Sequence, residues 1–333
     1  MTRKIHDTDY LFLTTRVRAL EGCLLNRGQM EQMLEAGSPE EATRILTDCG
    51  YPELETVSAI TVGEMLTRER ERLFQDLAEL VPDPAILAVF QLPHDYHNVK
   101  VLLKSEAMGI QEDRLLVDAG RIPSKQLAAA LRSGEVQNLP PQLGEAIDEA
   151  RQVLSATRDP QLGDMVLDRR YFQELLVLAE ETGSLFLQGY VQRMIDAANL
   201  RTVVRVLRMG QGTEFLEGIL FPGGNMEVER LLTGINGGSM LEELYASSPL
   251  VRAAESGAMA ARGGSLTQFE KDCDDAVLDE VRRAQFVAFG EEPVIAYLAA
   301  KEAEILAIRI ILTGRLADLA PDIIRERLRE AYV

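Results

Sequence analysis

Apolar residues recur every three or four positions along most of the chain, which is the spacing of one face of an α-helix. Segments that alternate apolar and polar residues, as half-buried strands do, are scarce. The clearest predicted helices cover residues 60–80, 165–182, 184–208, 265–289 and 292–313. Pro141 and Pro321 suit the first turn of two more helices, where the N–H that proline lacks has no partner anyway. The pattern therefore predicts an all-α fold.

One motif occurs three times, in DYHNVKVLLK (95–104), DAANLRTVVR (196–205) and EILAIRIILT (304–313). Each copy begins with an acid and carries a base five positions later; the acids are Asp95, Asp196 and Glu304, and the bases are Lys100, Arg201 and Arg309. A third matched position holds Asn98, Asn199 and Ala307. The last copy therefore keeps the acid and the base but loses the amide.

A glycine-led turn followed by a short predicted helix precedes each copy of the motif, at Gly28, Gly120 and Gly224. The first two copies also end in the same pair of residues, Met108–Gly109 and Met209–Gly210. Markers that recur in one order at similar intervals indicate internal repeats. We therefore predict three similar helical repeats as domains, at residues 1–109, 110–210 and 211–333.

The three acids fall in the same helical sector as the apolar stripe of each copy, so they are predicted to point inward. Pro93 suits a helix start, which would make Asp95 a first-turn carboxylate, whereas Asp196 and Glu304 lie in mid-helix. A buried carboxylate without a partner costs several kcal/mol. We therefore expect each acid to accept hydrogen bonds from a neighbouring helix, an asparagine, or an arginine such as Arg16, Arg18 or Arg193.

Two roles for the repeated motif follow from this inward placement. In the first, the acids hold helices in register within each repeat. In the second, some of the repeated polar residues line a surface that the three repeats share and that faces a partner.

The pair His94 and His97 lies beside the first acid and raises the question of a metal site. One metal ion needs three or four ligands, and the matched positions of the second copy are Ile195 and Ala198. We interpret the histidines as part of a polar cluster at a helix start. No metal and no cofactor is expected.

Asp and Glu outnumber Lys and Arg by 53 to 35, for a formal net charge of -18, which argues against nucleic acid as a partner. The three cysteines are far apart, so neither a disulfide framework nor a zinc knuckle is expected, and a reducing compartment is favoured. No apolar run is long enough to cross a bilayer. The first residues, with charges inside every apolar run, are not expected to be a signal peptide.

Sequence motifs of known catalytic sites are incomplete. The stretch GQGTEF (210–215) lacks the third glycine of a dinucleotide fingerprint, and no Walker lysine or Gly-x-Ser-x-Gly elbow occurs. The chain is therefore not expected to be an enzyme. The glycine-rich stretches 222–238 and 256–265 are interpreted as mobile loops and as a candidate contact rim.

The motif copies, above all HDYHNVKVLLKSE (94–106) and KEAEILAIRIILTGR (301–315), resemble the C subunit of bacterial and archaeal V-type (A-type) ATPases. This family is related to the d subunit of eukaryotic vacuolar ATPases, and the resemblance covers essentially the whole chain. It implies three similar helical domains in a pseudo-threefold, funnel-like arrangement.

The resemblance also implies a function. The family member is a non-catalytic subunit of the central stalk, or rotor, peripheral to the membrane on its cytoplasmic face. It is a socket that links stalk subunits D and F to the membrane proteolipid ring. It transmits torque for the transport of hydrogen or other ions, coupled to ATP hydrolysis or synthesis.

Two other functions stay open from the residues alone. Three repeats could form a concave surface on which a helical adaptor protein binds a soluble partner. A small enzyme could use His94 and His97, although their constellation is incomplete.

Overall fold

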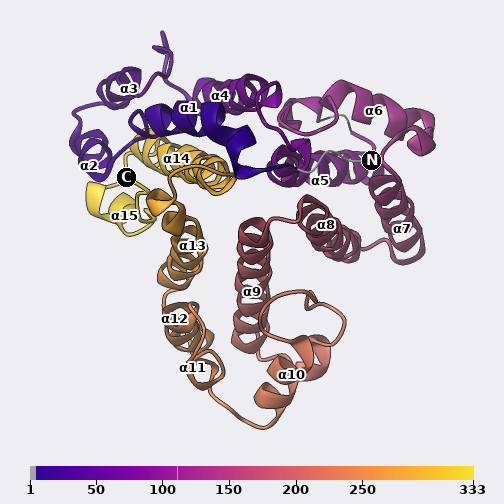
Figure 1. Cartoon of the computed structure of the whole chain (residues 1–333). Helices are drawn as coiled ribbons and strands as arrows, with labels where there is room; N and C mark the ends of the chain where they lie inside the picture. The colour runs from indigo at the N-terminus through magenta and orange to yellow at the C-terminus, as the bar shows by residue number, and fades with distance from the viewer. Residues whose placement is uncertain (1–4, 111) are drawn as a thin grey trace. The chain divides into compact units, whose positions relative to one another are not determined.

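The computed structural model describes residues 5–110 and 112–333, and every regular element in those ranges is a helix (Figure 1). The long helices are α4 (Ala59–Ala78), α5 (Pro84–Met108), α7 (Pro141–Thr157), α8 (Pro160–Thr182), α9 (Leu185–Arg208), α13 (Leu266–Arg282) and α14 (Glu292–Leu316). The shorter α-helices are α1 (Leu11–Glu21), α2 (Arg27–Glu35), α3 (Pro39–Thr47), α6 (Ser124–Ser133), α10 (Val228–Asn236), α11 (Leu241–Leu244), α12 (Val251–Ala261) and α15 (Pro321–Arg325). The 3-10 turns are η1 (Asp7–Tyr10), η2 (Asp113–Leu115), η3 (Val136–Asn138), η4 (Thr213–Phe215) and η5 (Arg283–Phe286). The all-α prediction is confirmed, and the predicted helices are present with ends that differ by a few residues.

Close packing divides the chain into two units. One unit joins the chain up to Glu69 to Leu185–Val333, and the other is Arg70–Ser184. The three repeats describe internal similarity, which is a different property, so their boundaries stay a prediction. Residues 1–4 of the first repeat and residue 111 of the second lie outside the described residues.

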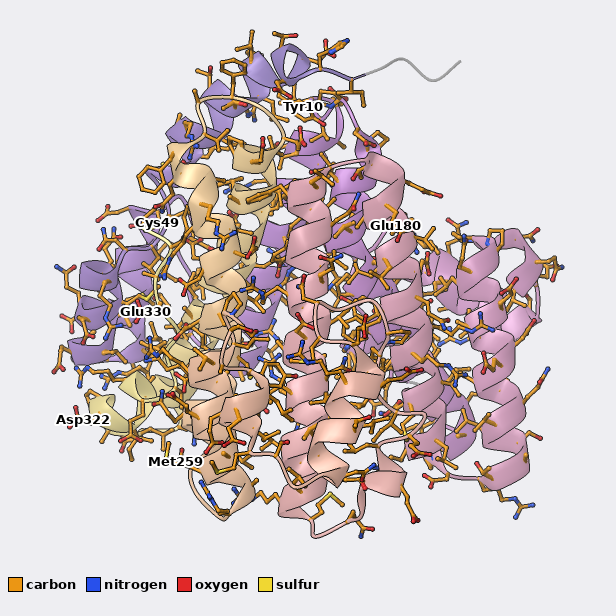
Figure 2. The ribbon with its side chains drawn as sticks, turned by 60° about the horizontal axis from the view of Figure 1, so that its bottom comes forward. Tyr10, Cys49, Glu180, Met259, Asp322 and Glu330 are labelled. Atoms are coloured by element: carbon orange, nitrogen blue, oxygen red, sulfur yellow. The ribbon has the colours of Figure 1, made fainter. Side chains whose placement is uncertain are left out.

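In the first unit, α9 packs against α12 and α13. Gly257 of α12 sits where a Cβ atom would lie 2.9 Å from Cγ2 of Val204, so the glycine permits close approach of α9 and α12. Met259, two residues on, points to solvent (Figure 2). The prediction of mobile loops at 222–238 and 256–265 is therefore wrong for most of both stretches, because α10 and α12 occupy them. Their glycines serve turns and packing.

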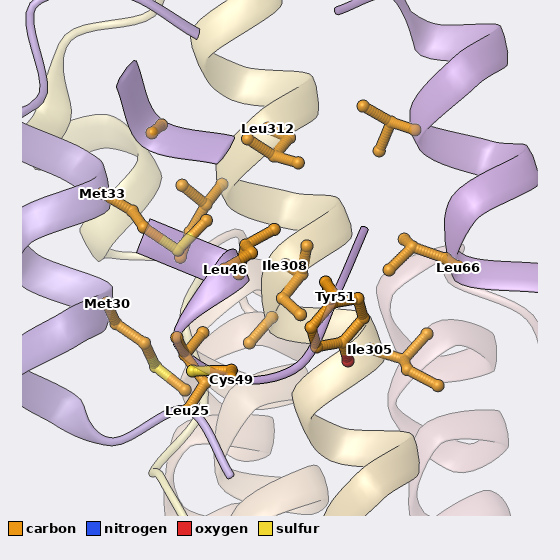
Figure 3. Packing of buried hydrophobic residues seen from close by; sticks show 14 of the residues in the cluster. Leu25, Met30, Met33, Leu46, Cys49, Tyr51, Leu66, Ile305, Ile308 and Leu312 are labelled. Atoms are coloured by element: carbon orange, nitrogen blue, oxygen red, sulfur yellow. The ribbon is translucent and has the colours of Figure 1, made fainter. Parts of the chain in front are cut away.

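The same unit builds a second core from the two ends of the chain. Helices α2 and α3 and the start of α4 pack against α14 (Figure 3). The buried side chains at this contact include Leu25, Met33, Leu46, Leu66, Ile305, Ile308 and Leu312. Segments separated by most of the sequence therefore depend on each other for burial.

In the second unit, α5 and α7 both pack along α8. Helix α5 begins at Pro84, capped by the Asp83 side chain, and continues through Pro93. An internal proline costs about 3 kcal/mol, and here burial of Leu92, Tyr96 and their apolar neighbours on α5 offsets this cost. The prediction that Pro93 starts the helix is therefore wrong, and all three motif acids lie inside helices.

Within the described ranges, no helix combines the length and the apolar character that a bilayer span requires.

The three cysteines are predicted to differ in reactivity. Cys23 is exposed, whereas burial raises the pKa of the Cys49 thiol to about 11 and that of Cys273 to about 12. Thiols react as thiolates, so at pH 8 a disulfide reagent should label Cys23 quickly and the other two slowly. We expect one fast equivalent in the native protein and three in denaturant. A fast phase that survives Cys23→Ser would contradict this assignment.

Candidate functional site

The first motif acid, Asp95 in α5, is fully buried and binds the turn that precedes α6. Its Oδ1 accepts the backbone N–H of Ile122 at 3.2 Å, and its Oδ2 accepts Nε–H of Arg121 at 2.7 Å. Burial raises the pKa of Asp95, and the Arg121 guanidinium opposes that rise. Arg121 also pairs with Glu174 of α8 at 2.8 Å, and Glu174 accepts a hydrogen bond from the Tyr96 hydroxyl. One arginine thus joins the turn to two helices.

The second acid, Asp196 in α9, is buried in the same way and binds the turn before α10. Its Oδ1 accepts the N–H of Met226 at 3.0 Å, and its Oδ2 accepts both the backbone and the side-chain N–H of Asn225 at 3.1 Å. Arg193 pairs instead with Glu280 of α13, at 2.8 Å. Arg193 was therefore a wrong candidate, and the main chain supplies most of the donors.

The third acid, Glu304 in α14, binds the turn before α2. Its Oε2 accepts the N–H of Leu25 at 2.5 Å. Its Oε1 accepts hydrogen bonds from the Tyr51 hydroxyl and from Nζ of Lys301, both at 2.6 Å. Lys301 lies 3.0 Å from Glu69 of α4 as well, so a buried base again connects the motif acid to a second carboxylate.

The three contacts follow one rule. The N–H that binds each acid belongs to Ile122, Met226 or Leu25, and each of these residues lies two positions before the first residue of α6, α10 or α2. The motif helix of one predicted repeat therefore binds a turn of the next, and the last motif helix binds the turn between α1 and α2 in the first. We call each of these contacts an acid clamp.

Glycine makes two of the clamps possible. A Cβ atom at Gly120 would lie 2.2 Å from Oδ1 of Asp95, and one at Gly224 would lie 2.2 Å from Oδ1 of Asp196. In the third clamp, Cys23 holds the equivalent position, two residues before Leu25. Glutamate is one methylene longer than aspartate, which leaves room there for a side chain. Gly28 lies inside α2 and is not the counterpart of the other two glycines.

The repeated asparagines bind the chain five residues ahead of each clamp. Asn98 donates to the carbonyl of Val117 at 2.8 Å and accepts its N–H at 2.9 Å. Asn199 makes the same two bonds with Phe221, both at 2.8 Å. An amide satisfies both peptide groups of one residue in this way.

Ala307 replaces asparagine where the chain does not need the amide. The residue five positions ahead of the third clamp is Leu20, which lies inside α1. The hydrogen bonds of that helix and the N–H of Cys23, which Leu20 O accepts at 2.9 Å, supply the partners of this segment.

The repeated bases lie on a different side of the motif helices. Lys100 pairs with Asp168 of α8 at 2.5 Å, and Arg201 pairs with Glu270 of α13 at 2.6 Å. Arg309 lines a surface groove beside α15. Two of the bases therefore connect long helices directly.

The histidines of the first motif are engaged separately. The His94 ring packs edge-on against Phe74, with 6.4 Å between centroids, and Nε2 of His97 lies 3.1 Å from the carbonyl oxygen of Leu115. In the part of the chain that the structure describes, no three His, Cys, Asp or Glu side chains are grouped to hold a metal ion.

The third clamp leaves little room for a small molecule. The cavity that Glu304 lines has a volume of about 10 Å³, enough for about one water molecule. Buried carboxylates saturated by fixed donors suit the joining of chain segments.

Comparison with known proteins gives consistent matches along the chain. A family model described as ATP synthase (C/AC39) subunit matches residues 13–327. The C subunit of the V-type sodium ATPase of Enterococcus hirae is 26% identical over 97% of this chain and 99% of that protein. The C subunit of the V-type ATP synthase of Thermus thermophilus is 27% identical over 93% and 94%, respectively. The C subunit of the A-type ATP synthase of Methanocaldococcus jannaschii is 23% identical over 96% and 86%.

Gly224→Ala is predicted to destabilise the protein, because its Cβ collides with the Asp196 carboxylate. We expect a loss of about 1–3 kcal/mol, measured as a fall in melting temperature. Gly63→Ala is the matched control: Gly63 lies in α4 with nothing within 4 Å of a new Cβ, so this change should raise the melting temperature.

Asp196→Ala should relieve that collision. Gly224→Ala is therefore expected to lower the free energy of unfolding by less in the Asp196→Ala background than in the wild type. A double-mutant cycle on free energies of unfolding measures this difference. Strictly additive effects would show that the two positions do not interact.

Asn199→Ala is predicted to remove both hydrogen bonds to the peptide groups of Phe221, at a cost of about 0.5–1.5 kcal/mol for each bond. Ala307→Asn should give no compensating gain, because Leu20 lies inside α1. Thermal denaturation of both variants checks this, and stabilisation by Ala307→Asn would disprove the explanation for the missing amide.

Proposed function

Because the chain belongs to the ATP synthase (C/AC39) subunit family, we propose that it is the central-stalk C subunit of a V-type ATPase or ATP synthase. In this proposal it is a socket on the cytoplasmic face of the membrane that links stalk subunits D and F to the proteolipid ring. It transmits torque and carries no catalytic site. The observation that carries the proposal is the match over residues 13–327.

The acid clamps support a mechanical role. A rotor part must turn as a body, so its segments must not slide past one another under torque. Each clamp fixes the middle of a long helix to a turn by charge-assisted hydrogen bonds, each worth about 1.5–3 kcal/mol. Arg121 and Lys301 extend two of the clamps to a second long helix. These contacts resist both sliding and rotation of the helices.

The motif residues favour a structural role over catalysis. The three acids are each bound by at least two donors, and Lys100 and Arg201 pair with acids on other helices. His94 and His97 contact a phenylalanine ring and a main-chain carbonyl. No observation favours an enzyme built on these two histidines.

We predict that the chain co-purifies with subunits D and F and with the proteolipid ring of its own rotary ATPase. A complex assembled without the chain should hydrolyse ATP but transport no ions, and adding the purified chain should restore transport. The measurement is ion uptake into vesicles, with ATP hydrolysis recorded in parallel.

Failure to bind either the stalk or the ring would contradict the proposal. Stable capture of a soluble protein from outside the ATPase, together with unchanged ion transport, would favour the helical adaptor.

A further inference from the structure

The three motif helices end in the same way. Fourteen residues after each acid, the backbone is left-handed: φ is 66° at Gly109, 67° at Gly210 and 54° at Asp318. The next N–H then binds the carbonyl five residues back, with Ile110 donating to Ser105, Gln211 to Val206 and Leu319 to Gly314. The repeat therefore extends beyond the motif, even though the third copy has an aspartate in place of glycine.

Exposed residues also recur around these ends. Met108 and Met209 are 69% and 67% exposed, and Ala317 holds the same position in the third copy. Eighteen residues after each motif acid lies an exposed acid, Asp113, Glu214 or Asp322. An exposed apolar residue follows one or two positions later, Leu115, Phe215 or Ile323. A helix end, an acid and an apolar residue thus form a set that follows every copy of the motif.

We call these three sets the helix-end sites. They consist of Met108, Asp113 and Leu115; of Met209, Glu214 and Phe215; and of Ala317, Asp322 and Ile323.

Surface grooves lie beside two of these helix ends. The groove at the first is about 350 Å³ and is lined by Ser105, Gly109 and Ile110 of the helix end with Leu131 of α6. The groove at the third is about 410 Å³ and is lined by Gly314, Ala317 and Leu319 with Ile324 of α15. Ser105 and Gly314 are equivalent positions, as are Ile110 and Leu319, so the hollow recurs in register.

The acids of the helix-end sites remain accessible to a partner. Asp113 binds Arg132 and Asp322 binds Arg325, yet the two carboxylate side chains are 54% and 89% exposed. Figure 2 shows Asp322 pointing away from its helix into solvent. Surface ion pairs are weak, so a basic group on a partner can compete for these carboxylates.

We propose that the three helix-end sites bind the same surface on three different proteolipid subunits of the membrane ring. This inference rests on the proposed function and assigns residues to one of its two contacts. A site that occurs three times in one chain matches a partner that presents many copies of one surface.

Charge points to the same partner. The chain carries a net charge of -18, and the C-terminal end of each motif helix adds a partial negative charge. Cytoplasmic loops of membrane proteins are rich in lysine and arginine. A short basic loop with one apolar side chain therefore complements each helix-end site, with the base on the acid and the apolar group against the exposed apolar residues.

The test is a charge reversal at all three acids, Asp113→Lys, Glu214→Lys and Asp322→Lys, in the full chain. We expect its affinity for the detergent-purified proteolipid ring to fall at least about tenfold, while binding to subunits D and F is unchanged. The matched control reverses Glu64, Asp279 and Glu145, which are also surface ion-paired and whose side chains are 57%, 61% and 66% exposed. The control has the same net charge and should bind the ring like the wild type.

Unchanged ring binding by the triple variant would overturn the inference, as would loss of stalk binding with ring binding intact. An equal loss in the control would show a bulk charge effect and would also overturn it. A wild-type chain that binds neither ring nor stalk would instead refute the proposed function. A second variant, Met108→Ser with Met209→Ser, tests the apolar part of the sites and should also lower the affinity for the ring. Its control is Leu185→Ser, which changes an exposed residue at the opposite end of α9 and should leave that affinity unchanged.

Discussion

A carboxylate inside a helical protein must replace the water that it has lost, and this requirement organises the whole chain. Asp95, Asp196 and Glu304 obtain their donors from turns that open the following helices. The main-chain N–H groups that bind the acids lie two positions before a helix begins, so no hydrogen bond within that helix can satisfy them. Each clamp therefore gives a hydrogen-bond partner to both the carboxylate and the main-chain N–H. Loss of one of these groups leaves the other buried without that partner.

The positions around each clamp adapt to its geometry. Aspartate occurs with glycine in two clamps, and glutamate occurs with Cys23 in the third. Asparagine occurs where an irregular segment needs partners for its peptide groups, and Ala307 occurs where α1 supplies them. Differences between the copies are therefore compensated locally, and the clamp itself is retained.

The third clamp has a wider consequence, because it joins the ends of the chain. Glu304 binds Leu25, and the surrounding core combines residues of α2, α3 and α14. The segments around Leu25 and Glu304 bind one another in the same way as the motif helices and turns of the other two clamps.

The sequence by itself determined the all-α class, the main helices, the threefold motif and its inward acids, because helical periodicity is a local property. It misplaced the start of α5, the glycine-rich loops and the role of Gly28, because burial can carry a helix through a proline and can use glycine for close packing. It also gave no sign of Arg121 as the partner of Asp95. Only the tertiary structure decided which turn each acid binds, since a hydrogen bond between distant segments depends on their approach in space and leaves no periodic signal in the chain.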